Sequence, residues 1–155
     1  MSILGKATIG FVAVMFVTLV GPAQEKKIER SNLPSSVEKT VAVQTHGAKI
    51  LGFSKEKEQG KTYYEAETMI DNRSRDVLID ENGKVVEVEE QVTLDSLSSA
   101  VRTRLQAKAG KGKIVKVESI TKNDHVVAYE AKVQREGKSF EVQVGSDGNS
   151  LDHEK

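Results

Sequence analysis

The sequence predicts an α+β fold of two tandem modules, each with one helix packed on a three- to four-stranded antiparallel sheet. Two observations carry this prediction. Two stretches of the chain resemble each other, and each opens with a helical apolar stripe that is followed by short alternating segments. A helix followed by several strands with tight turns is typical of an antiparallel sheet that has one face under the helix and the other toward water.

The internal similarity has a defined register. Leu33-Pro-Ser-Ser-Val37 resembles Leu97-Ser-Ser-Ala-Val101 at an offset of 64 residues, and Tyr64-Glu65-Ala66 resembles Tyr129-Glu130-Ala131 at an offset of 65. Insertions belong in loops, so we expect the hairpin between the first two strands of the second copy to contain the extra residue.

Each copy is expected to begin with an amphipathic helix. Ser31 or Asn32 is the expected N-cap of the first helix, and Asp95 or Ser96 that of the second, because short polar side chains accept hydrogen bonds from free N–H groups. Spacing of three or four residues gives each helix one apolar stripe. The stripes are Leu33, Val37, Val41 and Gln44 or Thr45 in the first copy, and Leu97, Val101, Leu105 and Lys108 or Ala109 in the second.

Alternating segments after each helix predict the strands. They cover about 49–56, 61–70, 74–80 and 84–90 in the first copy, and about 113–121, 125–134, 138–145 and a weak 149–153 in the second. Turn residues separate them, and Asn82-Gly83 and Asp147-Gly148 are the strongest signals because these pairs tolerate positive φ.

The N-terminus has the layout of a secretory signal peptide. Lys6 precedes an uncharged run over 7–20, and Gly21-Pro22-Ala23 supplies small residues for cleavage after Ala23. The run is short for a membrane-spanning helix, although an uncleaved anchor is the alternative. We therefore predict a signal peptide over 1–23, a lead segment over 24–32, modules over 33–91 and 92–155, and a periplasmic or secreted protein that leaves the membrane after cleavage.

Composition excludes several functions. The chain has 155 residues, no cysteine and a formal net charge of zero, with 30% charged residues. A nucleic-acid binder needs a basic excess, so none is expected. Disulfides and thiolate metal sites are excluded as well.

The strand motifs resemble a known family. The Leu-x-x-x-Val helix start, the Lys-Ile/Val strand, the Tyr-Glu-Ala strand and DVLIDENGKVVEVEE over 76–90 are similar to the PepSY domain. Two such units behind a signal peptide resemble the PepSY-like, β-lactamase-inhibitor-like periplasmic proteins. The second copy departs at its end, where Gly148-Asn-Ser-Leu151 lacks the paired valines of Val85-Val86. The resemblance implies a non-enzymatic binding module and carries over no binding residues, because the family has no fixed ligand motif.

No catalytic, metal or cofactor site is expected. His46, His125 and His153 lack metal-ligand spacing, and no nucleophile motif surrounds the serines. Glutamates alternate along the strands, which predicts a solvated sheet face and no catalytic carboxyl pair with a raised pKa. They are Glu56, Glu58, Glu65, Glu67, Glu87, Glu89 and Glu90.

The open sheet face is the expected site for a partner. Tyr63 and Met69 share that face of their strand with Glu65 and Glu67. In the second copy, Glu130 and Lys132 follow Tyr129, which matches Tyr64. Exposed tyrosine and methionine are favoured at protein interfaces, although a contact between modules explains them equally well.

These residues predict recognition of an extracytoplasmic protein or peptide, in its sharpest form the inhibition of a hydrolase. The alternatives are a carrier of a small apolar ligand between helix and sheet, and an envelope structural protein anchored by its N-terminus.

Overall fold

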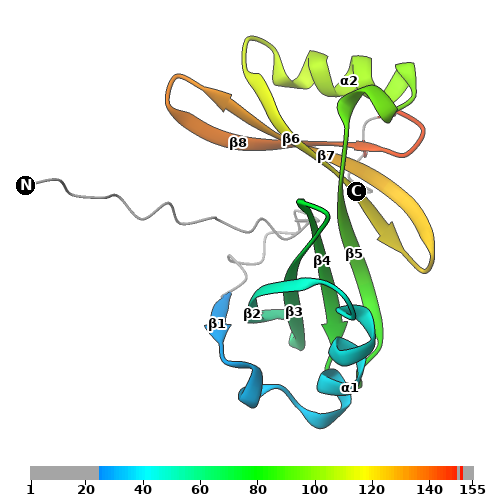
Figure 1. Ribbon diagram of the computed structural model, residues 1–155. Helices are drawn as coiled ribbons and strands as arrows, with labels where there is room; N and C mark the ends of the chain where they lie inside the picture. The colour runs from blue at the N-terminus through cyan, green and yellow to red at the C-terminus, as the bar shows by residue number, and fades with distance from the viewer. Residues whose placement is uncertain (1–24, 150, 152–155) are drawn as a thin grey trace, which may run out of the picture.

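The computed structural model describes residues 25–149 and residue 151 (Figure 1). Two helices interrupt a series of antiparallel strands. The elements are β1 (Lys26–Ile28), α1 (Ser35–Gln44), β2 (Lys49–Glu58), β3 (Lys61–Ile70), β4 (Arg73–Asp80), β5 (Val85–Val92), α2 (Ser99–Ala109), β6 (Lys113–Lys122), β7 (His125–Arg135) and β8 (Lys138–Gly145). Neither helix among these residues is long and apolar enough to cross a membrane.

All eight strands form one sheet, so the prediction of two tandem helix-on-sheet modules is wrong. The strand order is β1-β2-β3-β4-β5-β6-β7-β8, without a break between the halves of the chain. β5 pairs with β6 from Val88 opposite Thr121 to Val92 opposite Val117. This pairing satisfies backbone groups that would otherwise lie at an open edge of each half. In Figure 1 β5 runs from the α1 end of the molecule toward the α2 end.

Both helices lie on one face of the sheet and cover two separate apolar cores. Val37 and Val41 of α1 pack on the first core, and Val101 and Leu105 of α2 pack on the second. Thr45 and Ala109 are also buried, so the predicted stripes are confirmed. The remaining buried members are Phe53, Tyr64, Ala66, Val77 and Ile79 in the first core, and Leu97, Val117, Ala131 and Val144 in the second.

The helices begin later than the sequence predicts. Ser31 and Asn32 lie in a 3-10 turn (Arg30–Asn32), and α1 starts only after Pro34. Asp95 and Ser96 lie in a matching 3-10 turn (Leu94–Ser96), and the Oγ of Ser98 accepts the Val101 N–H at 3.3 Å. The predicted caps are therefore wrong, because a tight turn precedes each helix and moves its first free N–H groups toward the C-terminus.

The extra residue of the second half lies in a strand and not in a hairpin loop. The β2–β3 loop (59–60) and the β6–β7 loop (123–124) both contain two residues with positive φ. Along β7, Ala128 pairs with Ile120 but Val126 pairs with Thr121, which makes Val127 a bulge. A bulge adds one residue without breaking the sheet, so it accounts for the change in offset.

Two glycines dock the hairpin ends onto the helices. Gly83 has a φ of 87°, and a Cβ there would lie 2.6 Å from the carbonyl oxygen of Ser36 in α1. Gly148 has a φ of 84°, and a Cβ there would lie 2.9 Å from the carbonyl carbon of Ala100 in α2. No residue with a side chain fits either position without displacing a helix.

Two predictions concern the ends of the chain. The short β1, which contributes Lys26-Lys27-Ile28 opposite β2, was not predicted because three residues with two lysines give no alternating pattern. The weak strand predicted over 149–153 falls mostly outside the described residues, and Asn149 and Leu151 are not in a strand.

Candidate functional site on the open face of the sheet

We call the sheet surface opposite α1 and α2 the open face. On β3, Tyr64 and Ala66 point into the core under α1, so the alternate residues Tyr63, Glu65, Glu67 and Met69 belong to the open face. On β7, Ala131 lies in the core under α2, and Glu130 and Lys132 belong to the open face. The structure therefore places all six predicted residues on one surface.

These six residues form two groups. Strands β4, β5 and β6 separate β3 from β7. Four strand spacings correspond to roughly 19 Å, so the Tyr63 group and the Glu130 group do not form one compact site. The face between them holds further acidic residues, which include Asp76, Glu89 and Glu118.

Many carboxylates on the open face are buried, and the prediction of a solvated acidic face is wrong for them. Glu65 is only 2% exposed, and Glu89 is 7% exposed. Eight adjacent strands place long side chains side by side, and each side chain removes water from its neighbours. The buried glutamates are Glu56, Glu65, Glu87, Glu89, Glu118 and Glu130.

The strand register brings like charges into direct opposition. Asp76 on β4 lies between Glu67 on β3 and Glu89 on β5. Glu118 on β6 lies directly opposite Glu130 on β7. Like charges that face each other across a ladder are destabilising unless a proton, a cation or a donor neutralises them. The arrangement therefore needs positive charge or protons to be stable.

Burial raises several carboxyl pKa values. The pKa of Glu65 is raised to about 8, mainly by burial and then by the Asp76 carboxylate, although the Ser54 hydroxyl opposes the shift with a hydrogen bond of 3.1 Å. The pKa of Glu130 is also raised to about 8, by burial and then by Glu141. Burial raises the pKa of Glu89 as well, and Glu87 adds to it. These shifts follow from withdrawing the charged form from water.

Lysines neutralise part of the acidic face. Lys116 Nζ lies 2.6 Å from Glu118 Oε1, and Lys122 Nζ lies 2.7 Å from Glu87 Oε2. Lys27 forms an ion pair with Glu67. Four buried carboxylate oxygens of the described residues still have no hydrogen-bond partner, and a buried acceptor without a donor is costly. They are Glu56 Oε1, Glu65 Oε1, Glu89 Oε1 and Glu141 Oε2.

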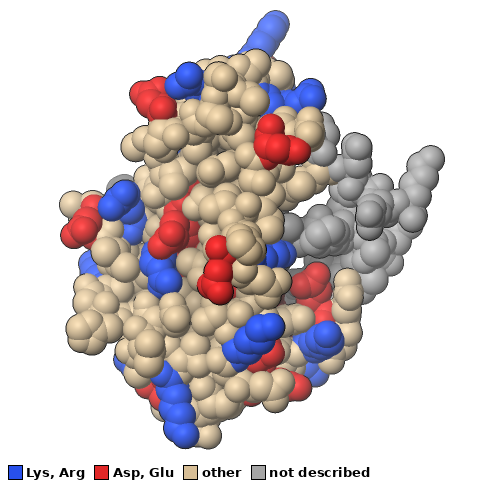
Figure 2. Space-filling model, turned by 90° about the vertical axis from the view of Figure 1, so that its right-hand side faces the viewer, with Lys and Arg blue, Asp and Glu red and all other residues tan. Residues whose placement is uncertain are grey.

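Other charges alternate in sign over the surface. Figure 2 shows lysines and arginines interspersed with acidic side chains on one side of the molecule, as expected for a chain with equal numbers of each. His46 and His125 are exposed at element ends, and His153 lies outside the described residues.

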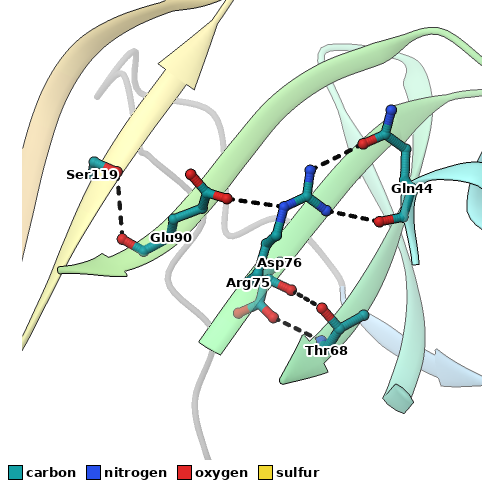
Figure 3. A network of polar contacts seen from close by, with 6 residues as sticks. All are labelled: Gln44, Thr68, Arg75, Asp76, Glu90 and Ser119. Atoms are coloured by element: carbon teal, nitrogen blue, oxygen red, sulfur yellow. Dashed lines mark hydrogen bonds and ion pairs between the residues drawn. The ribbon is translucent and has the colours of Figure 1, made fainter. Parts of the chain in front are cut away.

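A polar network fixes β4 between α1 and the open face (Figure 3). The Arg75 guanidinium donates 3.0 Å bonds to the carbonyl and the side-chain oxygen of Gln44 in α1, and another of 3.0 Å to Glu90 Oε1 on β5. On the same strand, Asp76 Oδ1 accepts the Thr68 N–H at 3.1 Å. The Arg75 guanidinium therefore attaches β4 to α1 and β5, and the Thr68 N–H orients the Asp76 carboxylate on the open face.

The sequence did not indicate Asp76, Glu118 or Glu141 as site residues. Asp76 and Glu141 are acidic residues at alternating strand positions, and the residues alone give no sign of which acidic positions lose their water. Only the pairing of β5 with β6 brings Glu118 beside Glu89. That pairing was the part of the fold that sequence reasoning missed.

Solved structures with the same fold come from Bacteroides. A protein described as periplasmic, from Bacteroides eggerthii, matches with a TM-score of 0.60 and 17% identity over 77% of this chain and 86% of its own. A DUF2874 family protein from Bacteroides ovatus gives 0.57 and 18% over 77% and 84%. A BLIP-like protein from Bacteroides fragilis gives 0.53 and 17% over 77% and 83%.

No family model and no curated protein matches the chain. At the identities of these structural matches, what the chain shares with them is the fold alone.

Proposed function

We propose that this protein is a non-enzymatic binding module of the bacterial envelope, and that its open face binds an extracytoplasmic protein or peptide through that partner's lysine and arginine side chains. The observation that carries the proposal is the set of buried carboxylates on that face with an oxygen that lacks a hydrogen-bond partner. A buried acceptor of this kind is costly in the free protein and is satisfied by an incoming donor.

Charge complementarity supports a basic partner. Glu65 and Glu130 hold protons at neutral pH because burial raises each pKa to about 8. An arginine or lysine placed beside either carboxyl favours the ionised form, so binding releases protons and creates charge-assisted hydrogen bonds. The distance between the two groups suits an extended segment or a protein surface more than a small molecule.

Apolar side chains add contact area to this face. Tyr63 and Met69 are half-buried on β3, and Leu78 is half-buried on β4. An interface core of a few aromatic and apolar residues inside a polar rim is common in protein complexes. We therefore expect Tyr63 and Met69 to act as apolar contacts and Glu65, Glu67, Glu130 and Lys132 to set the charge pattern.

Export is part of the proposal. The signal-peptide layout of residues 1–23 lies outside the described residues, and the proteins that share the fold include one described as periplasmic. We infer that cleavage after Ala23 delivers the chain to the periplasm. We also infer that the chain is related to the PepSY-like, β-lactamase-inhibitor-like proteins, because it combines a signal-peptide layout with the fold that it shares with a BLIP-like protein.

Inhibition of an extracytoplasmic hydrolase is the sharper form of the function. One protein with the same fold is described as BLIP-like, which supports testing hydrolases first. A carrier of an apolar ligand receives less support, because the hollow beside β1 is lined at most positions by charged residues. These are Glu25, Lys26, Lys27, Glu29, Lys55, Glu56 and Lys57, with Ile28 and Asn32.

Capture of the partner from envelope extract tests the proposal. The bait is the wild-type protein, and the test variant carries Tyr63→Ser and Met69→Ser on the open face. The matched control carries Val43→Ser, which removes an apolar side chain that is 72% exposed on α1. We expect mass spectrometry to find a protein that the wild type and the control retain and that the double variant releases. If that protein is a hydrolase, its activity should fall when the wild type is added.

Two results would count against the proposal. Equal retention by the double variant and the wild type would move the binding surface away from the open face. Recovery of a lipid or other small apolar molecule without any protein would favour the carrier instead.

A further inference from the structure

Three carboxylates from neighbouring strands meet at the centre of the open face. Asp76, Glu89 and Glu118 each offer an oxygen, and these oxygens all lie within 4.8 Å of one another. Asp76 and Glu89 are directly opposed across β4 and β5, and Glu118 follows on β6. Two ligands of one ion at about 2.4 Å are separated by no more than twice that distance, so the three oxygens fit around a single cation.

Glu89 is the most deeply buried member of the cluster. It is 7% exposed, and its Oε1 has no hydrogen-bond partner. The nearby Glu87 carboxyl repels its charge further. A carboxylate that is this deeply buried beside two others, with one oxygen unpaired, is a position that a cation would stabilise.

Contacts to the other two carboxylates leave room for an ion. The Thr68 N–H donates to Asp76 Oδ1 at 3.1 Å, and the hydroxyl of Ser74 donates to Glu118 Oε1 at 2.9 Å. Lys116 Nζ pairs with that same Glu118 oxygen at 2.6 Å. These contacts use one oxygen of each residue and fix the orientation of both carboxylates.

The donor set selects a class of metal. All three donors are carboxylate oxygens, and no imidazole or thiolate takes part in the cluster. Hard cations such as Ca²⁺ and Mg²⁺ prefer such oxygens, whereas zinc and copper favour nitrogen or sulfur. Ca²⁺ tolerates irregular geometry and longer bonds, and Mg²⁺ demands a close octahedron, so donors from three separate strands suit Ca²⁺ better.

We propose that Asp76, Glu89 and Glu118 bind one Ca²⁺ ion at the centre of the open face. A second oxygen cluster, formed by Glu25, Glu65 and Glu67, is a weaker candidate because the Lys27 ammonium pairs with two of its three carboxylates, whereas Lys116 forms an ion pair with only one member of the first cluster. A Ca²⁺ ion on Glu89 would leave the unpaired oxygens of Glu56, Glu65 and Glu141 for the proposed protein partner, so either claim can fail while the other stands.

Calcium-dependent thermal unfolding tests the site. The protein is purified from the envelope of cells that express the full chain, and it is unfolded in EDTA and in CaCl₂ at neutral pH. We expect Ca²⁺ at about 100 times its Kd to raise the unfolding midpoint by about 5 °C or more. Calorimetric titration with CaCl₂ should give one ion per chain, and MgCl₂ should bind at least tenfold more weakly.

Matched variants assign the ligands. Glu89→Gln should lower the Ca²⁺ affinity at least tenfold and remove most of the rise in midpoint. Glu56→Gln is the control, because Glu56 is also buried with an unpartnered oxygen on the same face but lies outside the cluster. Circular dichroism checks that each variant folds, and Glu118→Gln replaces Glu89→Gln if the latter does not.

Three results would overturn the proposal. The wild type could show no Ca²⁺-dependent shift and no titration heat. Glu89→Gln, or Glu118→Gln in its place, could retain the affinity of the wild type. Glu56→Gln could lose as much affinity as the cluster variant, which would indicate a diffuse attraction of cations to the whole acidic face.

Discussion

Glu65 illustrates how an ordinary residue type gains unusual chemistry from its surroundings. It lies on the open face of β3 and is 2% exposed, with Ser54 on β2 as its hydrogen-bond donor. Charged groups from several elements surround it, but burial is the largest cause of its pKa shift and raises the pKa to about 8. These groups are Glu25 and Lys27 at β1, Glu67 on β3 and Asp76 on β4.

Stability should therefore fall as the pH rises. Between the unfolded pKa of about 4.5 and the folded pKa of about 8, Glu65 keeps in the folded state a proton that the unfolded chain releases. The contribution is fully present below about pH 4.5 and is lost as the pH rises toward 8. One such proton gives a slope of about 1.4 kcal/mol per pH unit.

The variant Glu65→Gln removes this titration. We expect its free energy of unfolding at pH 8 to exceed that of the wild type by about 4 kcal/mol, and the two to converge near pH 4.5. Urea unfolding across this pH range measures the difference. Glu81→Gln, in an exposed turn, is the control, and an equal change of slope in both variants would refute the role of Glu65.

Gly83 gives a second prediction at the scale of one residue. Gly83→Ala should lower the free energy of unfolding by about 2–4 kcal/mol, because it combines positive φ with a Cβ 2.6 Å from the Ser36 carbonyl oxygen. Gly60→Ala is the matched control, since Gly60 has a φ of 79° but nothing within 4 Å of an added Cβ. Denaturant unfolding should show a loss of only about 1 kcal/mol for the control. Equal losses would mean that the helix contact adds nothing.

At the scale of elements, α1 is attached to the sheet by Arg75. Its guanidinium bonds the carbonyl of Gln44 at the end of the helix and Glu90 on β5. The corresponding position in the second half of the chain is Phe140, so α2 lacks this attachment and is held by its apolar stripe and by a 3.4 Å hydrogen bond from Arg104 to the Gly148 carbonyl. The two helices are therefore held by different interactions.

Arg75→Met should weaken the attachment of α1. It keeps most of the apolar stem but leaves the Gln44 carbonyl and Glu90 without their donor, so we expect a loss of about 1–3 kcal/mol in unfolding free energy. Hydrogen exchange should become faster in α1 and stay unchanged in α2. Arg73→Met, at an exposed position of the same strand, is the control. Uniform acceleration across both helices would contradict a local role.

Local patterns predicted most of the elements and few of their partners. The alternation of inward and outward residues along β3 and β8 and the apolar stripes of both helices could be predicted from the sequence, because alternation and helical spacing are local properties. The caps failed where 3-10 turns intervened, and the inserted residue was assigned to a loop although Val127 forms a bulge. Pairing and bulges depend on neighbouring strands, which a local pattern does not contain.

At the scale of the whole molecule, the β5–β6 ladder is the feature that differs most from the fold predicted from the sequence. It joins two halves that the sequence presents as modules, and it brings Glu89 and Glu118 together at the centre of the open face. The faces of Tyr63 and Met69 were predicted from alternation, but the burial of the acidic residues was not. Burial on this face arises only when all the strands lie side by side.

A continuous sheet predicts one cooperative transition. Urea unfolding followed by circular dichroism and by tyrosine fluorescence should give coincident curves, because neither half can lose its strands without exposing an edge of the other. Val88→Pro removes the backbone donor of a residue at the β5–β6 ladder and should destabilise both halves together. Two separate transitions would indicate that the halves fold independently.

The central claim is that the open face is the surface that binds the partner. Carbodiimide labelling of carboxyl groups, read by mass spectrometry with and without the captured partner, tests it directly. We predict that Glu67 and Glu141, both half-buried on the open face, lose labelling in the complex, whereas Glu81 and Glu136 in exposed turns keep theirs. Protection of Glu81 and Glu136 with unchanged labelling of Glu67 and Glu141 would contradict the account.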